Sequence, residues 1–399
     1  MLQKFEVGES MENSGMVLMP GGVRDLLPGE ARRKRELEAG LLKLFETWGY
    51  QEVITPTFEF YEVLAPALGE MLHDQLYRFI DDRGRIMVLR PDMTTPIARL
   101  VSTRLREQTF PLRLCYVANV FRRENHGGRE REFYQAGVEL LDAPGPEADA
   151  EVIGLAGEAL KLAGIKDFRI TLGQVEILTG VLAGAGFAAP ALEQAKLALN
   201  KKDLVAWDRL IAASHLARSR KKALAALPSL HGGIEVLDGV ADLIRDGEAW
   251  QGLAGLRKVW DRLADYGLQD RVSIDLTLLR GLAYYTGIVF EGYAPGVGYP
   301  LCGGGRYDKL LAKFGFPCPA TGFALSIERV LAALEKEAAP HHRVPDCFIT
   351  GGDPREIVQK ARALRQEGLA VEIEVTGRCL EESLAYASRK GIPQILVLE

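Results

Sequence analysis

The sequence lacks several features that would place a protein in a specialised class. Its 399 residues contain no uninterrupted apolar run of about 18 residues, the length that a membrane-spanning helix needs. The first nineteen residues have no basic region followed by an apolar one, which argues against a secretory signal and favours a flexible N-terminal tail over residues 1–19. We therefore expect a cytoplasmic protein that does not bind membranes.

Cysteine is scarce, and a basic excess is missing. The five cysteines are widely spaced and form no paired metal-ligand or disulfide pattern, so we expect buried, reduced thiols and no metal site. The net charge is −5 at pH 7, whereas nucleic-acid-binding surfaces are usually basic. An acidic chain can still carry a basic groove, so the charge is a weak argument against an RNA partner.

The most informative stretch is FRRENHGGREREFYQAGVELL, residues 121–141. Apolar runs over residues 112–121 and 131–141 stand on either side of its charged centre and predict two antiparallel strands. Gly127 and Gly128 permit a tight loop between these strands. Four charged side chains would then lie near one end of the sheet: Arg122, Glu124, Arg129 and Arg131. Arginine binds phosphate or carboxylate through paired hydrogen bonds, although a hairpin whose ion pairs face water has the same composition.

Six further motifs accompany this hairpin in a fixed order. They are PGGVRDLLPGEARRK (20–34), GYQEVITPTFE (49–59), VLRPDMTTPIAR (88–99), LLRGLAYYTGIVFEGY (278–293), CGGGRYDKLL (302–311) and GFALSIERV (322–330). Residues 49–59, with Pro56, resemble motif 1 of the class II aminoacyl-tRNA synthetases; the hairpin resembles motif 2 and the last stretch motif 3. Residues 278–293 and 302–311 resemble the histidine-specific branch, and so many matches in order are a strong signal.

The resemblance covers about residues 20–399 and implies an α+β fold. We expect a class II aminoacyl-tRNA synthetase-like antiparallel sheet with flanking helices over residues 20–181 and 267–338. A helical insertion should fill residues 182–266, and a small, truncated C-terminal α/β domain residues 339–399. Apolar spacing predicts helices over residues 29–48 and 146–163, and a strand over residues 168–178.

The same resemblance implies a histidine-binding site. Asp92 and Thr94 match groups around the amino group of the ligand, Gln135 and Arg280 match groups near its carboxylate, and Glu139 and Tyr285 match groups around its imidazole. The implied set is Asp92, Thr94, Arg122, Gln135, Glu139, Arg280, Tyr284, Tyr285 and Tyr307. Arg122, Glu124 and Arg329 match ATP contacts and would form a vestigial ATP-like site.

Two of these assignments also depend on the residues themselves. Glu139 is a carboxylate inside an apolar run, which favours a ligand role over a structural one. Tyr284 and Tyr285 fit a second interpretation equally well, in which they alternate across a strand with one in the core and one outside.

Several residues depart from the synthetase pattern. Asp92 and Met93 stand where the synthetases usually have Glu-Gly, Ala283 replaces an aspartate, and Ser326 replaces a glycine that lets the chain approach ATP. The loop 124–129 is one residue shorter than usual and has Asn125 where a second arginine is common. These changes weaken the expected binding of ATP and of the tRNA end but spare much of the histidine pocket.

The C-terminal stretch differs from a tRNA-binding module as well. Residues 340–399 contain eight Lys or Arg against nine Asp or Glu, and the anticodon-binding domain of the synthetases is longer; a tRNA-binding module should be more basic. The combination resembles the regulatory subunits of ATP phosphoribosyltransferase, which are non-catalytic relatives of histidyl-tRNA synthetase.

That resemblance implies a regulatory rather than a catalytic role. The chain would join and activate a short-form ATP phosphoribosyltransferase catalytic subunit in the first step of histidine biosynthesis. Histidine would be an allosteric effector that causes feedback inhibition, with no other cofactor. The chain would form a homodimer through its core and would not bind tRNA. A divergent histidyl-tRNA synthetase is the alternative hypothesis, and a stand-alone amino-acid sensor is a third.

Overall fold

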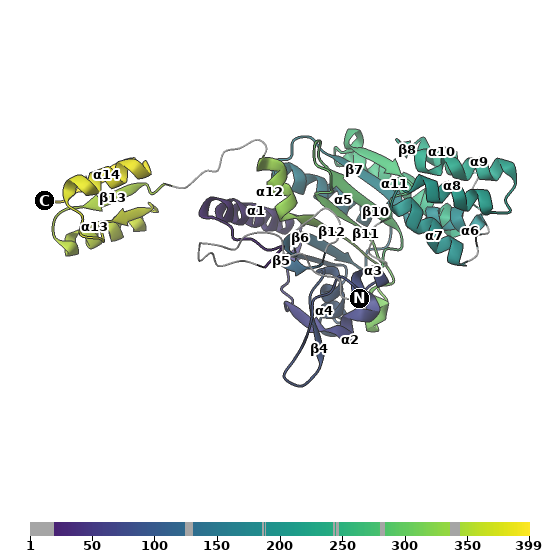
Figure 1. Cartoon of the computed structure of the whole chain (residues 1–399), viewed down its shortest axis with the longest axis horizontal. Helices are drawn as coiled ribbons and strands as arrows, with labels where there is room; N and C mark the ends of the chain where they lie inside the picture. The colour runs from purple at the N-terminus through teal and green to yellow at the C-terminus, as the bar shows by residue number, and fades with distance from the viewer. Residues whose placement is uncertain are drawn as a thin grey trace, which may run out of the picture. The chain divides into compact units, whose positions relative to one another are not determined.

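The computed structural model describes residues 20–123, 131–185, 187, 189–241, 244, 247–279, 284–335 and 344–399 (Figure 1). The chain divides into two compact units. The larger unit comprises residues 1–25 and 34–338, and the smaller unit residues 26–33 and 339–399. Each unit has its own sheet and its own hydrophobic core.

A nine-stranded mixed sheet forms the centre of the larger unit, in the order β1-β5-β6-β12-β11-β10-β7-β9-β8. The pairs β1–β5 and β7–β9 are parallel, and the other described neighbours are antiparallel. The strands are β1 (Gln51–Glu52), β5 (Leu112–Phe121), β6 (Glu132–Leu141), β7 (Arg169–Gln174), β8 (His231–Gly232), β9 (Val272–Asp275), β10 (Ile288–Tyr293), β11 (Cys302–Arg306) and β12 (Ala320–Ser326). The predicted hairpin is confirmed, because β5 pairs with β6 along its full length.

The two faces of this sheet bury different helices. Val138 of β6 belongs to a core with apolar residues of α1 (Pro28–Thr47), α5 (Pro146–Leu162), α11 (Gly247–Asp265) and α12 (Ile327–Glu335). Phe133 and Leu141 of the same strand belong to a second core with Ile97 and Val101 of α4 (Thr94–Arg104). Successive side chains of a strand point to opposite faces, so odd-numbered residues of β6 face α4.

Helix α1 confirms the helix predicted for residues 29–48. Leu37, Leu41 and Phe45 lie four residues apart, so one stripe of the helix is buried in the core behind the sheet. Gly49 then adopts a φ of 82°, a left-handed conformation that ends the helix and that glycine reaches without a steric penalty.

The strand predicted for residues 168–178 is too long. Strand β7 ends at Gln174, and α6 (Val175–Gly184) begins at once. Ile177, Leu178, Val181 and Leu182 are buried, and their spacing follows the helical period rather than the alternation of a strand. The helix therefore places all four against the core.

The stretch from residue 182 to residue 266 is mainly helical in its described part. Its further helices are α7 (Ala189–Asn200), α8 (Leu204–Ala213), α9 (Arg218–Ala226), the 3₁₀ turn η2 (Leu227–Ser229) and α10 (Val236–Ala241). The short strand β8 within this stretch was not predicted from the sequence. His231 and Gly232 pair with Asp275 and Ile274 of β9, which joins the helical stretch to one edge of the large sheet.

A second, three-stranded antiparallel sheet was also not predicted. Its order is β2-β4-β3. Its strands are β2 (Phe58–Phe60), β3 (Arg78–Ile80) and β4 (Ile86–Leu89). Between β2 and β3 the chain forms α2 (Tyr61–Leu64), η1 (Ala65–Ala67) and α3 (Glu70–His73). Two further 3₁₀ turns, η3 (Gln269–Arg271) and η4 (Leu311–Phe314), lie elsewhere in the larger unit. Buried Leu64, Leu68 and Val88 form the core beneath this sheet.

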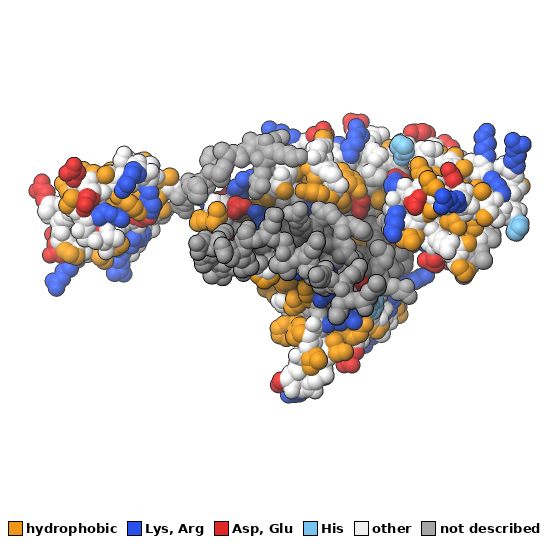
Figure 2. All heavy atoms as spheres, in the orientation of Figure 1, with side chains coloured by type: hydrophobic (Ala, Val, Ile, Leu, Met, Phe, Trp, Pro, Cys, Tyr) orange, Lys and Arg blue, Asp and Glu red, His pale blue; other side chains and the backbone are white. Residues whose placement is uncertain are grey.

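The smaller unit confirms the predicted alternation of strands and helices. Its parallel sheet has the order β14-β13-β15 and consists of β13 (Cys347–Thr350), β14 (Val371–Ile373) and β15 (Gln394–Val397), with α13 (Pro354–Gln366) and α14 (Leu380–Lys390). Ile349 packs with Ile357 of α13, whereas its neighbour Phe348 packs with Ala387 of α14. The two helices therefore cover opposite faces of the sheet, and Figure 2 shows acidic and basic side chains intermixed on this unit.

None of the described helices is long and apolar enough to cross a membrane. All five cysteines are free; four are buried as expected, but Cys379 is exposed because it lies at the N-terminus of α14.

Candidate functional site

A cavity lies on the α4 face of the large sheet. The residues that line it are Asp92, Thr94, Tyr116, Arg122, Gln135, Tyr284, Tyr285, Gly303, Tyr307, Gly322, Phe323 and Ala324. Gln135 reaches the cavity because the alternation along β6 points it to the same face as Phe133 and Leu141. Seven of the nine residues implied for histidine binding therefore line one cavity, although they come from five separate stretches of the chain.

Glu139 shares that face of β6 but lies behind the cavity wall. Its side chain is only 1% exposed. The Thr94 hydroxyl donates to Oε1 at 2.8 Å, and the Tyr307 hydroxyl donates to Oε2. Burial raises the pKa of Glu139 to about 8, against the lowering effect of the two hydroxyl groups. The carboxyl group therefore holds two residues of the cavity wall and keeps its proton at neutral pH.

This raised pKa predicts a pH-dependent stability that Glu139→Gln should remove. Between the ordinary pKa of 4.5 and about 8, the folded state keeps a proton that the unfolded state releases. The free energy of unfolding of the wild type should therefore fall as pH rises through this window, at up to about 1.4 kcal/mol per pH unit. Urea denaturation at several pH values between 5 and 9 measures the difference between the two proteins.

The exposed Glu193 provides a matched control, since its side chain is 72% exposed on α7. The Glu193→Gln variant should follow the pH dependence of the wild type. A constant difference in unfolding free energy between wild type and Glu139→Gln across the window would show that Glu139 is ionised throughout.

Asp92 both lines the cavity and begins a helix. Its Oδ1 accepts from the backbone N–H of Thr95 at 2.9 Å and its Oδ2 from the Thr95 hydroxyl at 3.1 Å, which satisfies donors in the first turn of α4. Burial raises the pKa of Asp92, while the Thr95 hydrogen bonds and the positive charge of Arg122 lower it. The Arg122 guanidinium also lies 4.8 Å from the Phe133 ring centroid.

The tyrosines form a cluster rather than an alternating pair. The ring centroids of Tyr284 and Tyr285 lie 4.9 Å apart, and those of Tyr284 and Tyr307 lie 5.7 Å apart at an angle of 69°. Neither Tyr284 nor Tyr285 belongs to a strand, since β10 begins at Ile288. The interpretation in which the two alternate across a strand is therefore wrong, and both line the cavity.

Tyr116 and Gly322 line the cavity as well, although neither was predicted from the sequence. Tyr116 of β5 pairs with Gly137 of β6, where a Cβ atom would lie 2.5 Å from the Tyr116 hydroxyl oxygen. Gly322 of β12 pairs with Glu139, and a Cβ there would lie 2.0 Å from Oε2 of Glu139. Each glycine makes room for the side chain opposite, a signal that depends on knowing the strand register.

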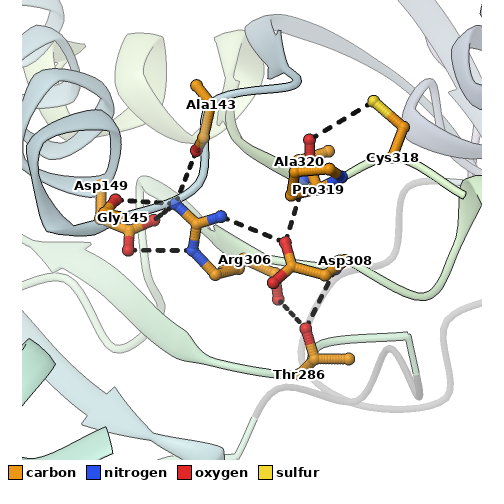
Figure 3. A network of polar contacts seen from close by, with 9 residues as sticks. All are labelled: Ala143, Gly145, Asp149, Thr286, Arg306, Asp308, Cys318, Pro319 and Ala320. Carbon is orange, nitrogen blue, oxygen red and sulfur yellow. Dashed lines mark hydrogen bonds and ion pairs between the residues drawn. The ribbon is translucent and has the colours of Figure 1, made fainter. Parts of the chain in front are cut away.

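Next to Tyr307, a buried polar network fixes the end of β11 (Figure 3). Arg306 donates through Nε to Oδ2 of Asp149 at 3.0 Å and through Nη1 to Asp308 at 3.1 Å, and its Nη2 lies 3.0 Å from Oδ1 of Asp149 in the same ion pair. Nη2 also donates to the carbonyls of Ala143 and Gly145. Burial lowers the pKa of Arg306, but the attraction of Asp149 and Asp308 outweighs it and raises the pKa overall. The network ties β11 to the N-terminus of α5.

Three predicted residues remain, and the structure describes only Arg329 among them. Arg280 and Glu124 lie outside the described residues, as do Ala283 and the loop 124–129. Arg329 belongs to α12; it donates to the carbonyl of Pro300 at 3.1 Å, and its guanidinium lies 5.2 Å from the Tyr299 ring centroid. The vestigial ATP contacts therefore stay a prediction.

The cavity combines groups that suit a small ligand with both charges. Asp92 can accept from a cation, Arg122 and Gln135 can donate to a carboxylate, and hydroxyl groups and aromatic rings form the rest of the wall. Among the described residues, no group of three His, Cys, Asp or Glu side chains is placed to hold a metal ion.

Comparison with known proteins agrees with this geometry. The family model described as histidyl-tRNA synthetase matches residues 22–330. The fold is also that of histidyl-tRNA synthetase from Nostoc, with a TM-score of 0.79 at 22% identity, 95% of this chain and 90% of that chain being covered. The chain is thus a histidyl-tRNA synthetase-like protein with the class II synthetase fold.

More specific matches place it within one branch. It is 49% identical over 378 residues to the ATP phosphoribosyltransferase regulatory subunit of Moorella thermoacetica, covering 94% of this chain and 96% of that protein. The regulatory subunit of Geobacter sulfurreducens is 40% identical, with 95% and 88% covered. A Bacillus halodurans structure described as an ATP phosphoribosyltransferase regulatory subunit/histidyl-tRNA synthetase gives a TM-score of 0.86 at 34% identity, with 96% and 99% covered. The chain belongs to the family of ATP phosphoribosyltransferase regulatory subunits.

Proposed function

We propose that this chain binds histidine in the cavity between α4 and the large sheet and regulates a short-form ATP phosphoribosyltransferase catalytic subunit. It activates that subunit and transmits feedback inhibition by histidine, without catalysing a reaction itself. The observation that carries the proposal is the convergence of an acid, a guanidinium, an amide and tyrosines on one cavity in a chain of this family. No cofactor other than the effector is required.

The chemistry of the wall suits each part of histidine. Asp92 and the Thr94 hydroxyl can bind the ammonium group, and Arg122 and Gln135 can bind the carboxylate. Tyr285 and Tyr307 provide aromatic rings and hydroxyl groups for the imidazole. Such a combination of a few placed polar groups with aromatic surface is typical of small-molecule sites.

Regulation then follows from differential affinity. If histidine binds more tightly to the inhibited state of the complex than to the active state, its binding shifts the population toward inhibition. A binding pocket of the synthetase type can therefore act as an allosteric site without any catalytic step.

We also propose a homodimer formed through the synthetase-like core. Ile54 is 85% exposed, and Phe58, Ile80 and Ile86 on the small sheet are 54%, 71% and 49% exposed. Figure 2 shows hydrophobic side chains gathered around the position that Figure 1 labels β4. Contiguous apolar surface of this kind usually marks an interface. Binding of tRNA is not part of the proposal, since residues 340–399 carry eight Lys or Arg against nine Asp or Glu.

The test is phosphoribosyl-ATP formation by the short-form catalytic subunit of the same organism, with and without this chain, over a titration of histidine. We expect activation by the chain that histidine reverses. No effect on a competent catalytic subunit would refute the proposal. In that case histidine-dependent exchange between ATP and pyrophosphate would test the alternative, a divergent histidyl-tRNA synthetase.

Glu139→Gln should weaken histidine binding by about 1–3 kcal/mol. The amide cannot ionise, and its NH2 group presents two hydrogens where the protonated carboxyl group has one, so the hydrogen bond with the Thr94 or the Tyr307 hydroxyl changes its direction and geometry. Isothermal titration calorimetry measures the dissociation constant, with Glu193→Gln as the exposed control. An unchanged dissociation constant would remove Glu139 from the effector site.

A further inference from the structure

Thr286 lies directly after the cavity residues Tyr284 and Tyr285 and contacts both neighbours of Tyr307 (Figure 3). Its backbone N–H donates to the carbonyl of Arg306 at 2.8 Å. Its hydroxyl oxygen accepts from the backbone N–H of Asp308 at 3.0 Å and lies 3.5 Å from the Arg306 carbonyl oxygen. One side chain therefore links the two tyrosine-bearing segments of the cavity wall.

Arg306 and Asp308, the two residues that Thr286 contacts, are themselves held by several hydrogen bonds. The guanidinium of Arg306 is fixed by Asp149 and by the carbonyl of Gly145 at the start of α5. The carboxylate of Asp308 accepts both from Arg306 and from the backbone N–H of Ala320 on β12 at 3.0 Å. Both neighbours of Tyr307 are thus held against α5 and the sheet, and Thr286 transfers that fixed position to the segment that carries Tyr284 and Tyr285.

Tyr307, which lies between Arg306 and Asp308, contacts both the support of the cavity wall and another tyrosine of the wall. Its hydroxyl donates to Glu139, and its ring lies 5.7 Å from that of Tyr284. Thr286 itself is partly buried and does not line the cavity, so any effect on a bound ligand must pass through the tyrosines. A displacement of a few tenths of an ångström at Thr286 would change the spacing of the rings and the Tyr307–Glu139 hydrogen bond together.

We propose that Thr286 is a positioning residue of the effector site, whose hydroxyl group sets the affinity for histidine by holding the Tyr307 hydroxyl in its hydrogen bond to Glu139, beside Tyr284. This inference rests on the proposed function, because it takes histidine as the ligand. It assigns to the hydroxyl a role that neither the methyl group nor the backbone of Thr286 can fill.

The experiment compares Thr286→Val with Thr286→Ser. Valine has nearly the same shape but no hydroxyl, whereas serine keeps the hydroxyl and loses a methyl group. We expect calorimetry to show histidine binding weakened about tenfold in Thr286→Val and changed less than about twofold in Thr286→Ser. Equal affinities of wild type and Thr286→Val would overturn the inference, whereas a wild type that fails to bind histidine would refute the proposed function instead.

A double-mutant cycle with Tyr307→Phe separates positioning from a general loss of structure. If Thr286 acts through the Tyr307 hydroxyl, Thr286→Val should change histidine affinity less than about twofold in the Tyr307→Phe background. Independent, additive effects would overturn the inference. If the valine variant does not fold, Thr286→Ala takes its place, and wild-type affinity in a folded variant without the hydroxyl would likewise overturn it.

Discussion

Replacing Arg306 with methionine is expected to lower the free energy of unfolding by about 3–5 kcal/mol. The Arg306 and Asp149 side chains are 10% and 8% exposed, so the variant leaves the Asp149 carboxylate buried without its cation. It also removes the donors to the carbonyls of Ala143 and Gly145. Because methionine fills similar volume, the loss should come from unpaired polar groups rather than from a cavity. Chemical denaturation at neutral pH measures the change.

An exposed ion pair of the same chain is the matched control. Arg257 and Asp238 form an ion pair with side chains 40% and 74% exposed, and Arg257→Met should change the unfolding free energy by less than about 1 kcal/mol. The double variant Arg306→Met with Asp149→Leu should recover part of the loss, because it leaves no charge buried. If Arg306→Met costs no more than Arg257→Met, the network does not stabilise the fold.

Much of the fold was predictable because its signals are local. The strands of the β5–β6 hairpin and helix α1 show a clear period, and several predicted helices have Gly, Pro or Asp at one end: Gly49 follows α1, Gly391 follows α14, and Asp353 and Pro354 begin α13. Asp353, for example, accepts from the backbone N–H of Arg355 at 2.7 Å and begins α13, with Pro354 in its first turn. Such residues fix the end of an element whatever the rest of the chain does.

The missed elements lack such local signals. Strands β2, β3 and β4 have only three or four residues each, too few to show an alternation that a short apolar run would not also show. The boundary between β7 and α6 has Gly173 and Gln174 but no Pro and no Ser, Thr, Asp or Asn to cap the helix, and apolar residues resume at Val175. In these places tertiary pairing rather than local preference decides the structure.

The site shows the same division between local and distant information. The motifs located Asp92, Gln135 and Tyr307, but they could not show that Glu139 would lie behind the cavity wall. That position depends on the register of β6 against β12. Arg306 and its partner Asp149 are 157 positions apart in the chain, so the sequence around Arg306 does not predict this ion pair. Motifs therefore identified most of the cavity wall, and strand register determined how it is supported.

Gly322→Ala is expected to reduce histidine affinity by more than about tenfold and to lower the free energy of unfolding by about 1–3 kcal/mol. The added Cβ would lie 2.0 Å from Oε2 of Glu139 and 2.5 Å from the carbonyl oxygen of Val138. Neither atom can easily move, since Val138 belongs to the paired strand and Glu139 is held by Thr94 and Tyr307. The displaced carboxyl group would release both residues of the cavity wall.

Gly255→Ala isolates this steric effect from the general consequence of replacing glycine. Gly255 lies inside α11 with no atom within 4 Å of its added Cβ, so alanine should raise the free energy of unfolding by about 0.5–1 kcal/mol and leave histidine binding unchanged. Calorimetry and chemical denaturation of the two variants give opposite signs for stability if the close approach of Gly322 to Glu139 is correct. Wild-type affinity and stability in Gly322→Ala would mean that Glu139 does not occupy this position, and its role as the support of the cavity wall would then be lost.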